Sequence, residues 1–248
     1  MPDPTRKESS VNRQHIEGVI PYSIVELARV TTGSHREGTD WKQSSRQTYS
    51  NFPNELSLLV TQLYMKNATA VLDPFAGWGE RHAAVKKLGI PYFGFDTSMV
   101  AIKHAKAKYG VSNIHGNSLT VPFPTVDFVF TCPPYGPLEI YDSPDGLDRL
   151  KSWKDFLTGY RKILSKCCDA LVSGGTVAML VGDWRKNHRY FDLTFETERI
   201  LKECGLTFHD KVIFSHAKRM NAAAHAAQAV RLGTTAKVHE SLVVMKKL

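Results

Sequence analysis

The sequence predicts an α/β fold: a doubly wound, mostly parallel sheet of seven strands with a C-terminal antiparallel strand pair. Short apolar runs alternate with segments of helical periodicity, which is typical of strands joined by crossover helices. Two runs, 70–79 and 127–136, end in glycine or proline turns, which suit ligand binding at the carboxyl edge of a parallel sheet. The last two apolar runs are 206–216 and 239–247. The segment between them has no apolar stripe that could pack on the core, so the two runs are expected to pair as strands.

Each element has a local signal in the sequence. Helices are expected where apolar residues recur at helical spacing, at 56–64, 80–88, 99–110, 153–172 and 195–205. Gly89 and Gly205 mark helix ends, and Ser98 is a suitable N-terminal cap. Strands are expected at 70–75, 91–96, around 114, 126–132, 174–183, 206–216 and 239–247. Loops are expected at 136–152, 184–190 and 216–239, at the carboxyl edge of the sheet.

The composition is that of a globular protein with one sizeable domain. The chain has 248 residues, of which 42% are hydrophobic and 23% charged. We expect residues 1–55 to form an N-terminal arm and flap, and residues 56–248 to form a single α/β domain. Within the arm, the polar segment 31–51 carries Trp41 and Tyr49, so it is either a solvated loop or a flap over bound cofactor or nucleic acid.

The net charge and the cysteine content indicate which binding partner and which cellular compartment to expect. A formal net charge of +8 favours a polyanionic partner such as nucleic acid. The 4 cysteines include no pair at metal-ligand spacing, so we expect free thiols, a reducing compartment and no metal site. No apolar run has the length of a membrane span and the N-terminus has no secretory leader, so we expect a cytoplasmic protein without a membrane partner.

The run AVLDPFAGWG, residues 70–79, has the features of a ligand-binding turn. Gly77 and Gly79 allow a tight turn and a close approach of the backbone to a ligand, while Phe75 and Trp78 provide an apolar wall. No Lys-Ser or Lys-Thr pair follows the glycines, which excludes a phosphate loop of the Walker type. Asp96 ends the next strand, where an acid in a dinucleotide-type fold accepts hydrogen bonds from ribose hydroxyls.

In their order along the chain, the segments DPFAGWGE (73–80), FGFD (93–96) and TCPPYG (131–136) resemble the S-adenosylmethionine-dependent amino-methyltransferases of DNA. The resemblance covers most of residues 56–183 and the last strand. The CPPY-x-x-LE-x-Y run, together with Arg81, is similar to modification methylases of phages and mobile elements. The resemblance implies a Rossmann-like class I methyltransferase domain, and a phage-encoded enzyme would work in the cytoplasm of its bacterial host.

The same resemblance implies S-adenosylmethionine as cofactor and an exocyclic amine of a DNA base as methyl acceptor, adenine N6 ahead of cytosine N4. The implied cofactor site comprises the glycine turn and the ends of the second and third strands: Asp73, Pro74, Phe75, Gly77, Gly79, Asp96, Asn117 and Ser118. Asp73 would accept from the cofactor's ammonium group, or cap the following helix instead. Asn117 stands where the family commonly has an acid, and it can offer only its carbonyl oxygen to an adenine amine.

The implied catalytic site is Cys132, Pro133, Pro134 and Tyr135. In the family, a side-chain oxygen at the first position and the following backbone carbonyl accept hydrogen bonds from the amine. The prolines leave carbonyls free of ladder pairing, and Tyr135 offers a stacking face to a base turned out of its helix. Cys132 replaces the usual Asp, Asn or Ser, which leaves three readings: backbone carbonyls hold the amine, the thiolate attacks a pyrimidine ring carbon, or the enzyme is degenerate.

A separate target-recognition domain is not expected, because the spacing between the two motifs is only what two strands and a helix require. Double-stranded DNA is the expected partner, with low specificity, a homodimer or a further protein that supplies specificity. The expected phosphate contacts are Arg185, Lys186, Arg189, Lys218, Arg219, Arg231 and Lys237. Two other classes stay open: an RNA base methyltransferase, and a methyltransferase fold that binds DNA without catalysis.

Overall fold

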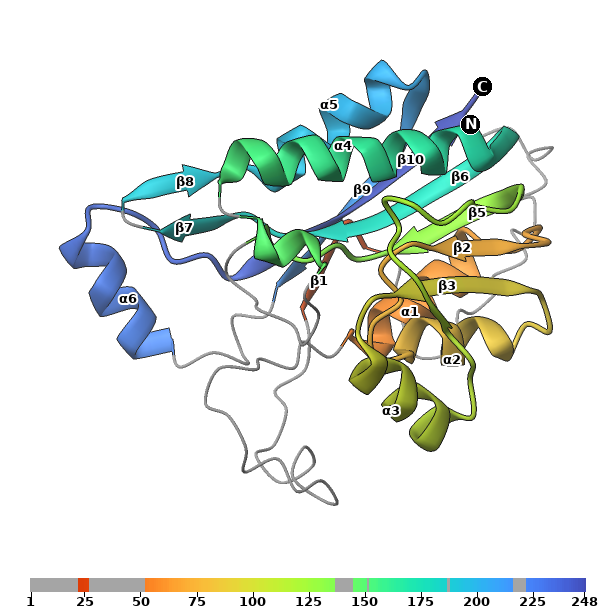
Figure 1. Ribbon diagram of the computed structural model, residues 1–248. Coiled ribbons are helices and arrows are strands. Elements are labelled where there is room, and N and C mark those ends of the chain that lie inside the picture. The colour runs from red at the N-terminus through yellow and green to blue at the C-terminus, as the bar shows by residue number, and fades with distance from the viewer. Residues whose placement is uncertain (1–21, 27–51, 137–144, 151, 187, 216–221) are drawn as a thin grey trace, which may run out of the picture.

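The computed structural model describes residues 22–26, 52–136, 145–150, 152–186, 188–215 and 222–248. Within these ranges, an eight-stranded sheet has the order β1-β9-β10-β6-β5-β2-β3-β4 and forms the centre of the molecule (Figure 1). The strands, from one edge to the other, are β1 (Ile24–Glu26), β9 (Leu206–Ser215), β10 (His239–Lys247), β6 (Leu171–Val181), β5 (Val126–Thr131), β2 (Val71–Asp73), β3 (Tyr92–Asp96) and β4 (Ile114–His115).

The sheet is parallel except at β10, which runs antiparallel to both β6 and β9. This arrangement confirms the predicted mostly parallel sheet with a C-terminal antiparallel pair. The additional strand β1 comes from the predicted N-terminal arm and pairs in parallel with β9, Ile24 opposite Ile213. Residues 1–21 and 27–51, which hold the rest of the predicted arm and flap, lie outside the described residues.

Helices cover both faces of the sheet, as a doubly wound fold requires (Figure 1). On one face lie α1 (Asn54–Leu63), α2 (Glu80–Lys86) and α3 (Met99–Tyr109), and on the other lie α4 (Trp153–Ala170) and α5 (Leu193–Glu203). The long helix α4 buries an apolar stripe at helical spacing, Phe156, Tyr160, Ile163, Leu164 and Cys167. Ser98 caps α3 as predicted, since its hydroxyl accepts from the backbone N–H of Ala101 at 3.2 Å.

Two segments predicted as loops have regular structure. The strands β7 (Trp184–Lys186) and β8 (Arg189–Phe191) pair as an antiparallel hairpin, in which Trp184 lies opposite Phe191 and the two rings stack at 5.4 Å. The segment between the last two sheet strands includes the helix α6 (Ala222–Arg231). The hairpin and α6 lie beyond one end of the sheet (Figure 1). A search of the described helices finds none that is long and apolar enough to cross a membrane.

The topology brings several strand ends to one edge of the sheet. The carboxyl ends of β2, β3 and β5 meet there, because these strands are parallel neighbours. The strand β10 is antiparallel, so its first residues lie at the same edge. A cavity at this edge is therefore lined by residues at the ends of all four strands.

Candidate active site

The glycine turn after β2 forms one wall of this cavity. Gly77 has a φ of +52°, and a Cβ there would approach only the Phe75 carbonyl oxygen, at 3.9 Å. Gly79 has a φ of +92°, and a Cβ there would lie 2.6 Å from the Cβ of Ala105 on α3. Gly77 therefore leaves its backbone open toward a ligand, whereas Gly79 is required for the turn to pack against α3.

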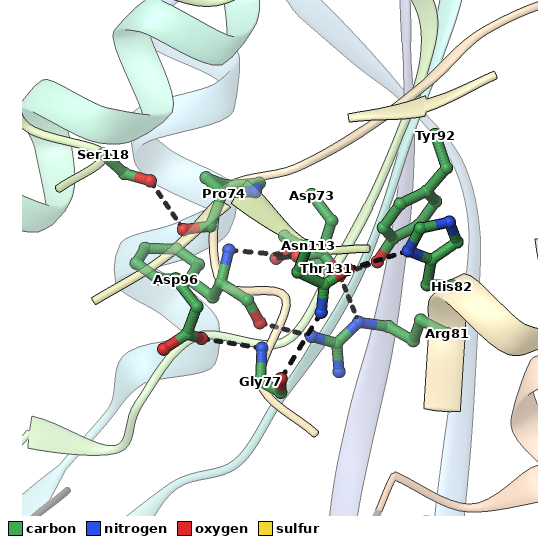
Figure 2. A network of polar contacts seen from close by, with 11 residues as sticks. Asp73, Pro74, Gly77, Arg81, His82, Tyr92, Asp96, Asn113, Ser118 and Thr131 are labelled. Carbon is green, nitrogen blue, oxygen red and sulfur yellow. Dashed lines mark hydrogen bonds and ion pairs between the residues drawn. The ribbon is translucent and has the colours of Figure 1, made fainter. Parts of the chain in front are cut away.

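Asp73, at the end of β2, is fully buried and bonds to four donors within the protein (Figure 2). One oxygen accepts from the Phe75 N–H at 3.0 Å and the Thr131 hydroxyl at 2.5 Å. The other accepts from the Arg81 Nε at 2.6 Å and the Tyr92 hydroxyl at 2.5 Å. A carboxylate has about four lone-pair positions, so the geometry favours a role in holding the turn to its neighbours. The predicted contact with the cofactor's ammonium group stays a prediction.

Arg81 completes this buried network from the first turn of α2. Its guanidinium bonds to Asp73 and to the Phe75 carbonyl, and lies 4.8 Å from the centre of the Phe52 ring. Burial lowers the pKa of Arg81, but the charge of Asp73, the charges of Tyr92 and Cys132 and the hydrogen bond to Asp73 together offset this effect and raise the pKa above its usual value. Arg81 therefore stays charged, and its bonds to Asp73 and Phe75 fix α2 to the end of β2.

Asp96, at the end of β3, has a different environment from Asp73. One oxygen accepts from the Gly77 N–H at 2.7 Å (Figure 2). The other oxygen accepts from the Ser98 N–H at 2.8 Å. Burial raises the pKa of Asp96, and the two N–H donors oppose this effect. Asp96 lines the cavity, and two donors use only half of a carboxylate's capacity. The side chain can therefore accept further hydrogen bonds from a ligand, as its predicted role requires.

His82 on α2 is linked to the glycine turn through Asn113. Its ring stacks on Tyr92 at 4.2 Å, and its Nδ1 donates to the Asn113 side-chain oxygen at 2.8 Å. The Asn113 amide in turn donates to the Gly77 carbonyl at 3.5 Å (Figure 2). Burial lowers the pKa of His82, so the neutral ring is the favoured form.

Asn117 and Ser118, predicted to reach the adenine of the cofactor, both line the cavity. The Asn117 oxygen accepts from the Leu119 N–H at 2.9 Å, and its amide donates to the Asp145 carbonyl at 3.2 Å. The Ser118 hydroxyl donates to the Pro74 carbonyl at 2.7 Å. Both side chains thus fix the loop after β4 to neighbouring loops.

The segment from Cys132 to Tyr135 follows β5 and forms the other wall of the cavity. The Cys132 sulfur lies 3.7 Å from the Tyr135 hydroxyl, and that hydroxyl donates to the carboxylate of Glu240. The Tyr135 ring stacks against Trp184 at 6.4 Å. Burial, followed by the charges near Cys132 and Glu240, raises the pKa of Tyr135 far above its usual value, so it is a neutral hydrogen-bond donor.

Sequence reasoning missed several residues that line the cavity. Their carboxylates are the most notable: Glu80, Asp145, Asp148 and Glu240 join the predicted Asp96. Among the described lining residues, Arg81 is the basic one, and it is paired with Asp73. The cavity therefore favours cationic ligands and hydrogen-bond donors. An available signal was that Glu240 begins a strand predicted to be antiparallel, which places it at the ligand edge.

The predicted phosphate contacts that the structure describes lie on the hairpin and in the segment between β9 and β10. Arg185, Lys186 and Arg189 are exposed on the hairpin, where Arg185 lies 4.8 Å from the Tyr190 ring and Arg189 lies 5.3 Å from the Phe191 ring. Lys237 lies 4.3 Å from the same Tyr190 ring and donates to its hydroxyl, while Arg231 is exposed at the end of α6. Lys218 and Arg219, like most of the predicted loop 136–152, lie outside the described residues.

Solved structures with a similar fold share little sequence with this chain. An S-adenosylmethionine-dependent methyltransferase from Methanosarcina mazei has a TM-score of 0.53 and 12% identity, over 81% of this chain and 99% of its own. The chain has the class I methyltransferase fold. A TehB-like S-adenosylmethionine-dependent methyltransferase from Corynebacterium glutamicum has a TM-score of 0.50 and 14% identity, over 80% of this chain and 90% of its own.

TrmN from Thermus thermophilus is a third solved structure with this fold, with a TM-score of 0.53 and 16% identity over 79% of this chain. The match covers 49% of TrmN, so this chain spans about half the length of that protein. No family model matches the chain, and no curated protein matches its sequence.

Proposed function

We propose that this protein is an S-adenosylmethionine-dependent methyltransferase that acts on an exocyclic amine of a DNA base, adenine N6 ahead of cytosine N4. The observation that carries the proposal is one cavity with two different walls. The glycine turn and Asp96 form one wall, and the Cys132–Tyr135 segment forms the other. A cofactor and a methyl acceptor can therefore meet between them.

The first wall suits the proposed cofactor in shape and charge. Gly77 leaves its backbone open to the cavity, and the remaining acceptor capacity of Asp96 suits two ribose hydroxyls. When bound, the cofactor supplies a methyl group on a positively charged sulfur. The carboxylates on the side of the glycine turn, Glu80 and Asp96, suit this positive charge.

The second wall suits a flat, amino-bearing acceptor. Pro133 and Pro134 have no N–H and so cannot continue the pairing of β5, which ends at Thr131, and this leaves the carbonyls of the segment available to an amine. The Tyr135 ring can provide an edge or a face for a base turned out of its helix, and stacking of this kind contributes about 1–3 kcal/mol per base. The acidic lining disfavours acceptors that carry a carboxylate or a phosphate at the reacting end.

The hairpin supports DNA as the source of the base. Trp184 at its base stacks on Tyr135, so the exposed Arg185, Lys186 and Arg189 lie on an element that contacts the acceptor wall. Guanidinium groups held over aromatic rings can bind phosphate and still keep their ring contacts. We expect these side chains to bind the phosphates next to the flipped nucleotide.

The test is methyl transfer from radiolabelled S-adenosylmethionine to unmodified double-stranded DNA, single-stranded DNA and bulk RNA, followed by nucleoside analysis. Label in N6-methyladenine or N4-methylcytosine of DNA is the expected result. Label in RNA alone would replace DNA by RNA as the substrate. Label at a pyrimidine ring carbon would contradict the amine proposal and make Cys132 the nucleophile.

A further inference from the structure

The carboxylate of Glu240 lies near Cys132, the residue that departs from the pattern of the DNA amino-methyltransferases. Glu240 is the second residue of β10, and it is opposite Phe214 of β9. Its carboxylate accepts from the Tyr135 hydroxyl, and the Cys132 sulfur lies 3.7 Å from that same hydroxyl. A thiol and a carboxylate therefore flank one phenol at the acceptor wall.

Gly182 lies against both Glu240 and Tyr135. A Cβ at Gly182 would lie 3.3 Å from the Cγ of Glu240 and 3.4 Å from the Cζ of Tyr135. These distances are at or below ordinary carbon contact, so glycine at this position lets both side chains converge. Trp184 stacks on the Tyr135 ring and limits its movement.

The three side chains differ in their strength as hydrogen-bond acceptors, and an amino group of a ligand needs a good acceptor. A thiol is a weak hydrogen-bond acceptor, and a neutral phenol bonded to a carboxylate acts as a donor. A carboxylate is a strong acceptor for an N–H group, and such charge-assisted bonds are about twice as strong as neutral ones. Glu240 is thus a strong hydrogen-bond acceptor at this wall, whereas the sulfur of Cys132 is a weak one.

We propose that Glu240, positioned by Tyr135, accepts a hydrogen bond from the amino group of the methyl acceptor and so selects amino-bearing bases. In this arrangement Glu240 supplies the side-chain oxygen that the family takes from the position of Cys132. The inference rests on the proposed function and deepens it, since it assigns recognition of the acceptor amine to a residue of the last strand.

The first test is Glu240→Gln, which keeps the size of the side chain and removes its charge. We expect methyl transfer to slow by about 10- to 100-fold, the size expected for loss of a hydrogen bond to a charged group. The calorimetric affinity for S-adenosylmethionine should not change. The matched control is Glu203→Gln on the outer side of α5, where Glu203 pairs with Arg161 and Arg199. Wild-type rates in Glu240→Gln would overturn the inference.

A second pair of variants separates contact with the amine from mere support of Tyr135. Tyr135→Phe removes the hydroxyl and keeps both the ring and the carboxylate, so we expect a smaller loss than in Glu240→Gln. Equal losses in both variants would show that Glu240 only positions the ring. We also expect Cys132→Asp in the Glu240→Gln background to recover part of the rate, because it returns a carboxylate to the acceptor wall.

A binding measurement separates this inference from the identity of the polynucleotide. Ligand-observed NMR would compare deoxyadenosine, deoxycytidine and purine deoxyriboside, which lacks the amino group, on protein saturated with S-adenosylhomocysteine. We expect a preference for the amino-bearing nucleosides that Glu240→Gln loses. Transfer to RNA with this preference intact would refute the proposed DNA substrate alone. Methylation of DNA with no amino preference would refute the inference alone.

Discussion

Behind the glycine turn, the buried pair Asp73 and Arg81 is bonded within the protein, whereas at the Cys132–Tyr135 wall a carboxylate and a phenol line the cavity itself. Asp73 takes four donors from within the protein, and Arg81 is buried against it. On the other side, the Tyr135 hydroxyl donates a hydrogen bond to Glu240 at the cavity wall. The contrast teaches that one half is a rigid frame for a common cofactor and the other can vary with the substrate.

The largest effect is expected in the frame, from Asp73→Ala. Removing one partner of a buried ion pair leaves the other uncompensated, so we expect a loss of about 3–5 kcal/mol in the free energy of unfolding. Chemical denaturation would measure it. The control is Asp127→Ala, which removes a carboxylate that binds the N–H groups of Thr69 and Ala70 at the opposite edge of the sheet. An equal or smaller loss in Asp73→Ala would show that the frame is not built around this group.

The second largest effect is expected on DNA binding by the hairpin, next to the acceptor wall. Charge reversal of Arg185 and Arg189 together should weaken DNA binding and reduce the slope of log affinity against log salt by about 2, one for each lost phosphate contact. Fluorescence anisotropy at several salt concentrations would measure both quantities. Reversal of Lys66 and Lys87, exposed at the other edge of the sheet, is the matched control. An unchanged slope in the hairpin variant would remove this element from the DNA interface.

The smallest effect is a pH dependence of the frame through His82. Burial lowers the pKa of His82 in the folded protein, so below its ordinary value of about 6.5 the unfolded chain binds more protons than the folded one. The contribution of His82 to the free energy of unfolding should therefore be complete above that pH and decline as the pH falls below it. Thermal unfolding at several pH values should show a weaker decline in His82→Gln than in the wild type. Parallel curves would mean that His82 does not contribute.

The fold could be predicted from the sequence because its signals are local. Alternating apolar runs, glycine stops and the Ser98 cap fixed most elements. The hairpin was missed because its strands are short and basic, and it depends on one cross-strand stack of Trp184 on Phe191. The helix α6 was missed because its small side chains show no core stripe.

The candidate site could be predicted only in part. The glycine turn, Asp96 and the Cys132–Tyr135 segment meet in one cavity, since each follows the carboxyl end of a parallel strand. Glu240 is distant in sequence from all of them, and its place depends on an antiparallel strand order and on the space left by Gly182. The saturation of Asp73 by internal donors likewise depends on Thr131 and Tyr92, which belong to neighbouring strands.

The most direct test of the two-part cavity is calorimetric titration with S-adenosylmethionine of the wild type, Asp96→Asn and Glu240→Gln side by side. We expect saturable binding in the wild type, affinity reduced by about 100-fold in Asp96→Asn through loss of charge-assisted hydrogen bonds, and wild-type affinity in Glu240→Gln. Undiminished affinity in Asp96→Asn, or an equal loss in both variants, would contradict the division of the cavity into a cofactor wall and an acceptor wall.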